Sequence, residues 1–148
     1  IPFNGLGVAS AAGLEAVLSG RWEGDARGLS ACLTTDRLLA DAGWARLVLE
    51  LIGEVIRGAR ALGFDLPEDL AQTQIARTRT MGDYKPSTLI DFERQQALEL
   101  EALFLEPLRR ALKAGVAGPR LEALCRVLQQ LDAASSEGRK ELTRSCIR

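Results

Sequence analysis

The stretch at residues 83–99 reads DYKPSTLIDFERQQALE and interrupts an otherwise helical pattern. Pro86 keeps the residue before it out of helical backbone, so Ser87 is placed to cap a short helix. The glutamine pair at 95–96 can end that helix and allow a second one to begin shortly before Glu99. On one straight helix Ser87 and Glu99 would lie about 18 Å apart, too far to contact one small ligand. The break predicts instead that two helix starts converge on one pocket.

Two interpretations of this pocket follow from the residue types. A hydroxyl, free backbone N–H groups and a carboxylate at two helix starts would suit a small polar substrate, in particular an anionic one. The competing interpretation is structural: Ser87 is only a helix cap, and Glu99 is only an acidic partner of the helix dipole. The pattern alone leaves both open, and the structural interpretation is the simpler one.

Helical periodicity dominates the rest of the chain, and the alternation typical of strands is not evident, so the expected fold class is all-α. Apolar residues from Leu47 to Ala59 form the broad buried face of a long helix, which Gly63 should end. Gly115 should end the helix that contains Glu99. The expected helices cover about residues 7–18, 36–62, 67–79, 97–114 and 119–132, followed by a short C-terminal tail at 133–148.

Composition argues against several classes of function. The chain has 148 residues, enough for one domain with a core, and its net charge of −1 gives no electrostatic case for nucleic acid or an anionic membrane. It contains no histidine, which rules out Ser-His-Asp and Cys-His nucleophiles and His-ligated zinc. Its apolar runs are too short to cross a bilayer. Cys32, Cys125 and Cys146 are odd in number and widely spaced, which argues against a disulfide framework and favours a reducing, cytoplasmic location.

Three segments together resemble the C-terminal domain of ketopantoate reductases (2-dehydropantoate 2-reductases). That family carries a P-S-M-L-Q-D run, a Glu twelve positions after the Ser, and a G-x-x-T-P turn before its last helix. The matching residues here are Tyr84 to Asp91, Glu99, and Gly115 to Leu124. The start of the chain, Phe3-Asn4-Gly5, is similar to the Lys-x-x-x-Asn that opens the family's helical domain. The resemblance implies a multi-helix substrate-binding domain over 1–132, like that of ketopantoate reductase and 6-phosphogluconate dehydrogenase.

The resemblance also implies roles for particular residues. Family members reduce ketopantoate to pantoate, in pantothenate biosynthesis, with NADPH bound to an N-terminal Rossmann domain. Glu99 would be the catalytic residue that hydrogen-bonds the substrate, and Ser87 and Asn4 would bind the substrate. The family's general-acid Lys would fall immediately before Ile1. We therefore expect neither a cofactor-binding residue nor a metal site in this chain, and no NADP binding or reduction by it alone.

Several positions depart from the family pattern. Val8 stands where a second Asn is usual, and the glutamine pair at 95–96 replaces a Gly. Thr88 replaces Met, and Gly118 replaces Thr. The loss of a polar contact at Val8 suggests a different 2-keto acid substrate or an unorthodox member of the family. The sequence around Leu98–Glu101 resembles a divergent, fungal branch of the family.

The partners implied by the resemblance are a small 2-keto acid and the domain's own Rossmann half, and a homodimer is left open. Neither nucleic acid nor a membrane is expected. The alternative from a different class is a stand-alone helical domain that binds a small molecule or a partner, or performs non-redox chemistry without a nucleotide. A plain helical interaction module is a third hypothesis. A Rossmann half ending in Lys before Ile1 would support the reductase hypothesis over both.

Overall fold

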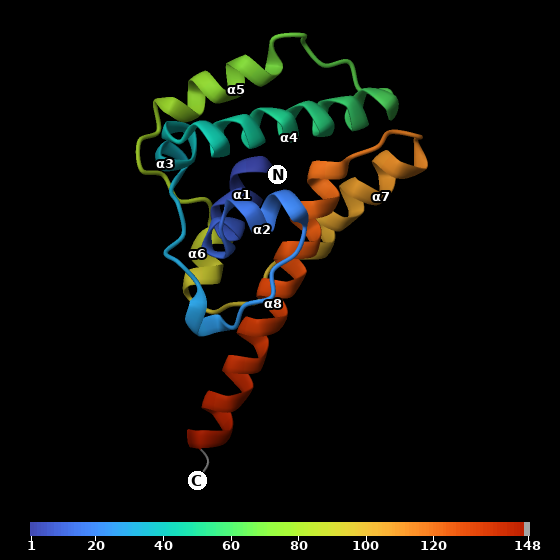
Figure 1. Cartoon of the computed structure of the whole chain (residues 1–148). Helices are drawn as coiled ribbons and strands as arrows, with labels where there is room; N and C mark the ends of the chain where they lie inside the picture. The colour runs from blue at the N-terminus through green and yellow to red at the C-terminus, as the bar shows by residue number, and fades with distance from the viewer. Residues whose placement is uncertain (147–148) are drawn as a thin grey trace.

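The computed structural model describes the backbone of residues 1–146 and the side chains of residues 1–136. Within this part of the chain every regular element is a helix, which confirms the all-α expectation (Figure 1). The elements are, in chain order, α1 (Pro2–Ala9), the 3-10 turn η1 (Ser10–Ala12), α2 (Leu14–Ser19), the 3-10 turn η2 (Ala26–Gly28), α3 (Thr35–Ala40), α4 (Ala42–Ala61), α5 (Leu70–Arg79), α6 (Ser87–Glu93), the π-helix η3 (Glu101–Leu105), α7 (Glu106–Lys113) and α8 (Pro119–Cys146).

Helix α1 lies at the centre of the fold and contacts α3, α4, α6 and α8. Two glycines allow these close contacts. A Cβ atom on Gly5 would lie 2.7 Å from Cδ2 of Leu124 and 2.8 Å from Cε1 of Phe104. A Cβ atom on Gly7 would lie 2.9 Å from Cδ1 of Leu89. These separations are shorter than van der Waals contact, so α8, η3 and α6 pack where they do because α1 has no side chain at either position.

The apolar face of α4 enters the core over its first half, as predicted. The buried hydrophobic residues of that half are Trp44, Leu47, Val48, Leu51 and Ile52. Farther along, the predicted face is only partly buried, at Val55, Ile56 and Ala59. These three side chains line hollows on the surface of the molecule, so the core prediction holds for the first half alone.

The helix expected over residues 36–62 is two helices, because the backbone turns at Asp41. This residue has extended dihedral angles (φ −87°, ψ 129°), and its Oδ1 accepts hydrogen bonds from the N–H groups of Gly43 (2.9 Å) and Trp44 (3.0 Å). An aspartate in that position is a strong N-cap, so α4 begins anew after a short α3. The end of α4 is as predicted, since Gly63 takes a left-handed φ of 91°.

Other element boundaries also differ from the expectation. The helix predicted at 7–18 begins five residues earlier in the structure, at Pro2, and Gly13 (φ 90°) separates η1 from α2. The helix predicted from Pro67 begins at Leu70. A proline fixes its own φ but does not by itself start a helix, because the following donors still need acceptors.

Helix α8 continues past residue 132 to Cys146 without interruption. Its second half extends away from the other helices, toward the C-terminus marked in Figure 1. The chain has no proline after Pro119, so nothing of that kind stops the helix at 132. Residues 133–146 are therefore helical, and the predicted tail continues α8.

Candidate functional site

Ser87 is the first residue of α6 and does not cap it. The N-cap is Pro86, whose carbonyl accepts hydrogen bonds from the N–H groups of Leu89 (3.0 Å) and Ile90 (3.1 Å). The Ser87 side chain is exposed and makes no capping hydrogen bond. The capping role proposed for Ser87 is therefore wrong, because Pro86 occupies the capping position, and the hydroxyl faces solvent.

The predicted break after α6 is present and has a defined geometry. Gln95 adopts a left-handed backbone (φ 56°), which is uncommon for a residue other than glycine. The N–H of Gln96 donates to the carbonyl of Asp91 (2.8 Å), and the N–H of Gln95 donates to that of Phe92 (2.9 Å). This pair of hydrogen bonds is a Schellman motif, so the glutamine pair ends α6 in the way that the usual glycine would.

Glu99 follows a residue that is anchored to α8. The side chain of Leu98 is buried, and its N–H donates to Oδ1 of Asp132 on α8 (3.2 Å). The Glu99 carboxylate itself is exposed, and the Glu99 carbonyl accepts from the N–H of Leu103 (3.3 Å). Leu98 and Asp132 thus hold the backbone next to Glu99 while leaving its side chain accessible.

The segment after Glu99 is a π-helix where a regular helix was expected. Residues Glu101–Leu105 form η3, which passes directly into α7. Pro107 lies in the first turn of α7 and has no N–H, so it cannot make the usual bond to residue 103. π-Helical turns are rare and occur frequently at functional sites.

The three candidate residues lie on α1 or on segments that pack against α1. Asn4 lies on α1, Leu89 of the Ser87 helix packs on Gly7, and Phe104 of η3 packs on Gly5. None of the four hollows described for the molecule contains Ser87 or Glu99, whereas Asn4 lines one of them. Ser87 and Glu99 therefore share none of these four hollows with Asn4.

The hollow beside Asn4 lies between the start of α1, α4 and α5 and has a volume of about 330 Å³. We call it the Asn4 hollow. Residues of three separate elements line it, among them Phe3, Asn4, Ile52, Ile56, Leu70 and Gln74. The sequence pattern did not indicate Gln74, because an exposed glutamine in a helix is ordinary and only the packing of α5 against α4 places it here.

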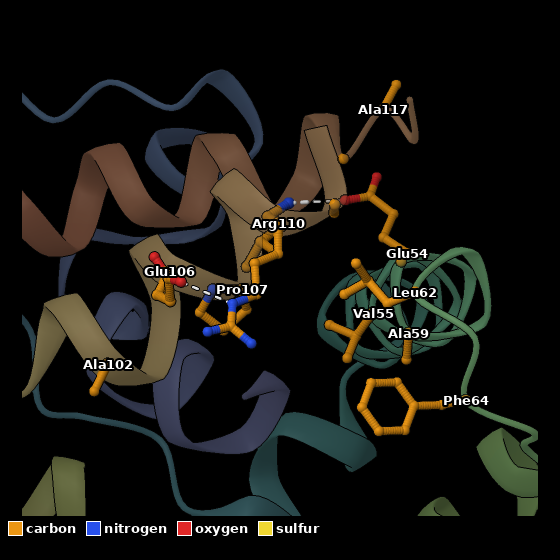
Figure 2. Close-up of a pocket in the computed structure, with 14 residues that line it drawn as sticks. Glu54, Val55, Ala59, Leu62, Phe64, Ala102, Glu106, Pro107, Arg110 and Ala117 are labelled. Atoms are coloured by element: carbon orange, nitrogen blue, oxygen red, sulfur yellow. Dashed lines mark hydrogen bonds and ion pairs between the residues drawn. The ribbon is translucent and has the colours of Figure 1, made fainter. Parts of the chain in front are cut away.

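A second hollow, of about 360 Å³, lies between α4 and α7 (Figure 2). Its α4 side is apolar and includes Leu62 and Phe64, whose side chains are exposed. Across the hollow, Arg110 is paired with Glu106 (2.7 Å). At one edge Glu54 accepts hydrogen bonds from the first turn of α8. We call it the Phe64 hollow.

Titration and composition restrict the chemistry of the described residues. Burial, and to a smaller extent the negative charge of Glu93, raises the pKa of the Cys32 thiol to about 11. Burial also raises the pKa of the Cys125 thiol to about 11. Both free thiols are therefore protonated at neutral pH and are poor nucleophiles; the side chain of Cys146 lies outside the described residues.

The side chains up to residue 136 include no group of three or more potential metal ligands. No helix in the described part is long and apolar enough to cross a membrane.

A family model described as "Ketopantoate reductase PanE/ApbA C terminal" matches residues 27–132. The chain belongs to the ketopantoate reductase family. Over 132 residues it is 36% identical to a 2-dehydropantoate 2-reductase of a Nostoc species, an alignment that covers 84% of this chain and 41% of the relative. The chain thus spans about two fifths of the length of this reductase.

Two crystal structures of ketopantoate reductases share the fold. The 2-dehydropantoate 2-reductase of Methylococcus capsulatus is 31% identical with a TM-score of 0.66, over 87% of this chain and 41% of that protein. The enzyme of Geobacter metallireducens GS-15 is 32% identical with a TM-score of 0.67, over 87% of this chain and 36% of that protein. The chain therefore has the all-α fold of the reductases' C-terminal domain. These relatives give no support to the predicted fungal branch.

One departure from the pattern of ketopantoate reductases has a structural explanation. The side chain of Val8 is fully buried within the core, so this position cannot supply a polar substrate contact. Gly118 has none, since a Cβ atom there would lie at an ordinary contact distance of 3.4 Å from Oε2 of Glu54.

Proposed function

We propose that this chain is the substrate-binding and catalytic helical domain of an NADPH-dependent 2-keto acid reductase that acts on 2-dehydropantoate or a related acid. The observation that carries the proposal is that Ser87 and Glu99 are both exposed and unused by helix capping. Each lies at the start of a segment that packs on α1, the helix of Asn4. Membership of the ketopantoate reductase family supports the same function.

In this proposal each side chain has a defined task. Glu99 is the catalytic residue: it accepts a hydrogen bond from the substrate hydroxyl and favours the protonated form of a nearby lysine through its charge. The Ser87 hydroxyl and the adjoining backbone N–H groups hold the substrate carboxylate. Asn4 contacts the substrate from α1. The proton donor is the lysine that the family resemblance places just before Ile1.

The described residues do not form a binding site for the nucleotide. NADPH supplies hydride to a 2-keto carbon, and its usual cradle is a strand followed by a glycine-rich turn and a helix. Residues 1–146 contain helices and turns but no strand. We propose that NADP is held by a Rossmann half of the kind that the family carries, and that this half closes the site over Ser87 and Glu99. Their exposure in the helical domain is consistent with that closure.

Location and assembly complete the proposal. The protonated, unpaired thiols of Cys32 and Cys125 support a reducing, cytoplasmic setting. A role in pantothenate biosynthesis follows if 2-dehydropantoate is the substrate. The exposed apolar residues around the Phe64 hollow leave room for a homodimer contact.

Steady-state kinetics of the complete reductase test the catalytic role. Glu99→Gln keeps the shape of the side chain and removes its charge, so kcat for 2-dehydropantoate with NADPH should fall at least about a hundredfold. Glu101→Gln is the matched control, because Glu101 lies two residues away, is exposed and pairs with Arg109. Equal kcat values for the two variants would show that Glu99 has no catalytic role. Calorimetry on the present chain alone should detect no NADPH binding.

A further inference from the structure

The π-helix η3 lies between Glu99 and α7 and holds one residue more than an α-helical turn would. The N–H of Glu106 donates to the carbonyl of Glu101, five residues earlier, whereas the bonds of an α-helix join residues four apart. Each residue of an α-helix turns the chain by about 100° about the helix axis. The additional residue in η3 therefore sets the direction in which the segment of Glu99 faces relative to α7.

Pro107 gives a physical reason for the wider turn. It lies in the first turn of α7, directly after η3. In a regular α-helix the N–H of residue 107 would donate to the carbonyl of Leu103. Proline has no N–H, and its ring would clash with that same carbonyl. A π-turn avoids both problems, because its geometry does not pair residue 107 with residue 103.

The chain after η3 is packed more firmly than the chain before it. Leu108 and Ala111 of α7 are buried, and a Cβ atom on Gly58 of α4 would lie 3.0 Å from that of Ala111. Between residues 93 and 102, by contrast, Leu98 has the one buried side chain. A change in the number of residues per turn at η3 would therefore be taken up by the segment of Glu99, while α7 stays on α4.

We infer that Pro107 is a positioning residue of the reductase, because the π-turn that it imposes determines where the Glu99 carboxylate faces. The inference rests on the proposed function, since it takes Glu99 to be catalytic. Pro107 lines the Phe64 hollow, which does not contain Glu99 (Figure 2). Its effect on the reaction therefore passes through the backbone of η3 and not through contact with the substrate.

Pro107→Ala in the complete reductase tests the inference, because it supplies the missing N–H and removes the ring. A crystal structure of the variant should show a regular α-helix, with the N–H of residue 107 bonded to the carbonyl of Leu103. We expect kcat for 2-dehydropantoate with NADPH to fall at least about tenfold, because Glu99 is misdirected. KM should change less than about twofold, since Ser87 and Asn4 still hold the substrate. The melting temperature should not fall, because alanine favours a helix.

A second variant and a matched control separate positioning from damage to the fold. Deletion of the exposed Ala102 in the Pro107→Ala background removes one residue from the turn and rotates the segment of Glu99 back by about 100°. This deletion should restore kcat to within about threefold of that of the unmodified reductase. Pro67→Ala is the matched control, because Pro67 is exposed, precedes α5 and lies outside η3. It should leave kcat and KM unchanged.

Three outcomes would overturn the inference and leave the proposed function in place. The first is a Pro107→Ala reductase with a regular α-helix and full kcat, which would show that the π-turn does not position Glu99. The second is a π-turn that persists in this variant, which would show that Pro107 does not impose it. The third is a loss of kcat that deletion of Ala102 does not restore. Full kcat in the Glu99→Gln reductase would instead overturn the proposed function together with the inference.

Discussion

Oε2 of Glu54 on α4 accepts a hydrogen bond of 2.9 Å from the backbone N–H of Leu121 on α8. The other oxygen, Oε1, accepts one of 3.0 Å from the N–H of Arg120. One carboxylate, only 6% exposed, thereby satisfies two of the donors that the first turn of a helix leaves without a partner. This contact fixes the start of α8, the helix whose Asp132 holds the backbone beside Glu99.

Glu54→Leu should lower the free energy of unfolding by about 2–5 kcal/mol, because it leaves one buried and one partly buried N–H group without acceptors. Urea denaturation of the chain measures this. Glu50→Gln is the control on the same helix: its ion pair with Arg120 (2.8 Å) is partly exposed, so the expected loss is below about 1 kcal/mol. Equal losses would show that the Glu54 hydrogen bonds add nothing to stability.

Asp132→Ala should remove the acceptor for the Leu98 N–H and lower stability by about 1 kcal/mol. In the complete reductase it should also reduce kcat with little change in KM, because the backbone beside Glu99 is less well held. Asp132→Asn keeps an acceptor oxygen and should restore most of both. If the alanine variant keeps full kcat, Asp132 does not position Glu99.

Gln95→Gly should raise the free energy of unfolding by up to about 1 kcal/mol, because glycine adopts the left-handed conformation at the end of α6 without a steric cost. Gln95→Val should lower it by a similar or larger amount. For a chain of this size 1 kcal/mol corresponds to a shift of about 2–4 °C in Tm, which calorimetry resolves. A melting temperature lowered by glycine would mean that the Gln95 side chain contributes more than the strain costs.

Leu51→Ala should lower the free energy of unfolding by about 2–5 kcal/mol, because Leu51 is fully buried in the core face of α4. Leu49→Ala, at an exposed position of the same helix, should change it by less than about 0.5 kcal/mol. Denaturation midpoints in urea compare the two. Indistinguishable midpoints would contradict the core assigned to α4.

Stability should decrease at alkaline pH through the buried thiols. Folding raises the pKa values of Cys32 and Cys125 from about 9 to about 11, so the folded state retains protons that the unfolded state releases. Their contribution is therefore fully present below pH 9 and is lost as pH rises through about 11. In a Cys146→Ser background, native iodoacetamide labelling at pH 8 should be far slower than labelling in urea. Comparable rates would show that the two thiols are accessible and ionised.

Much of the fold could be predicted from local sequence. Periodicity gave the helical class and the buried positions of α4 from Leu47 to Ile52. Gly63 and Gly115 end their helices because only glycine takes a positive φ readily. Three segments together suggested the ketopantoate reductase family, namely Tyr84 to Asp91, Glu99, and Gly115 to Leu124.

Other features depend on contacts between residues far apart in the chain, and only the tertiary structure decided them. Glu54 is a cap only because α8 begins beside it. Val8 is buried because α1 lies at the centre of the fold. Gln74 lines the Asn4 hollow because α5 packs next to α4 and the start of α1. The sequence by itself therefore indicated the helical class, most of the helical segments and the family, whereas packing decided which polar side chains are structural and which stay exposed.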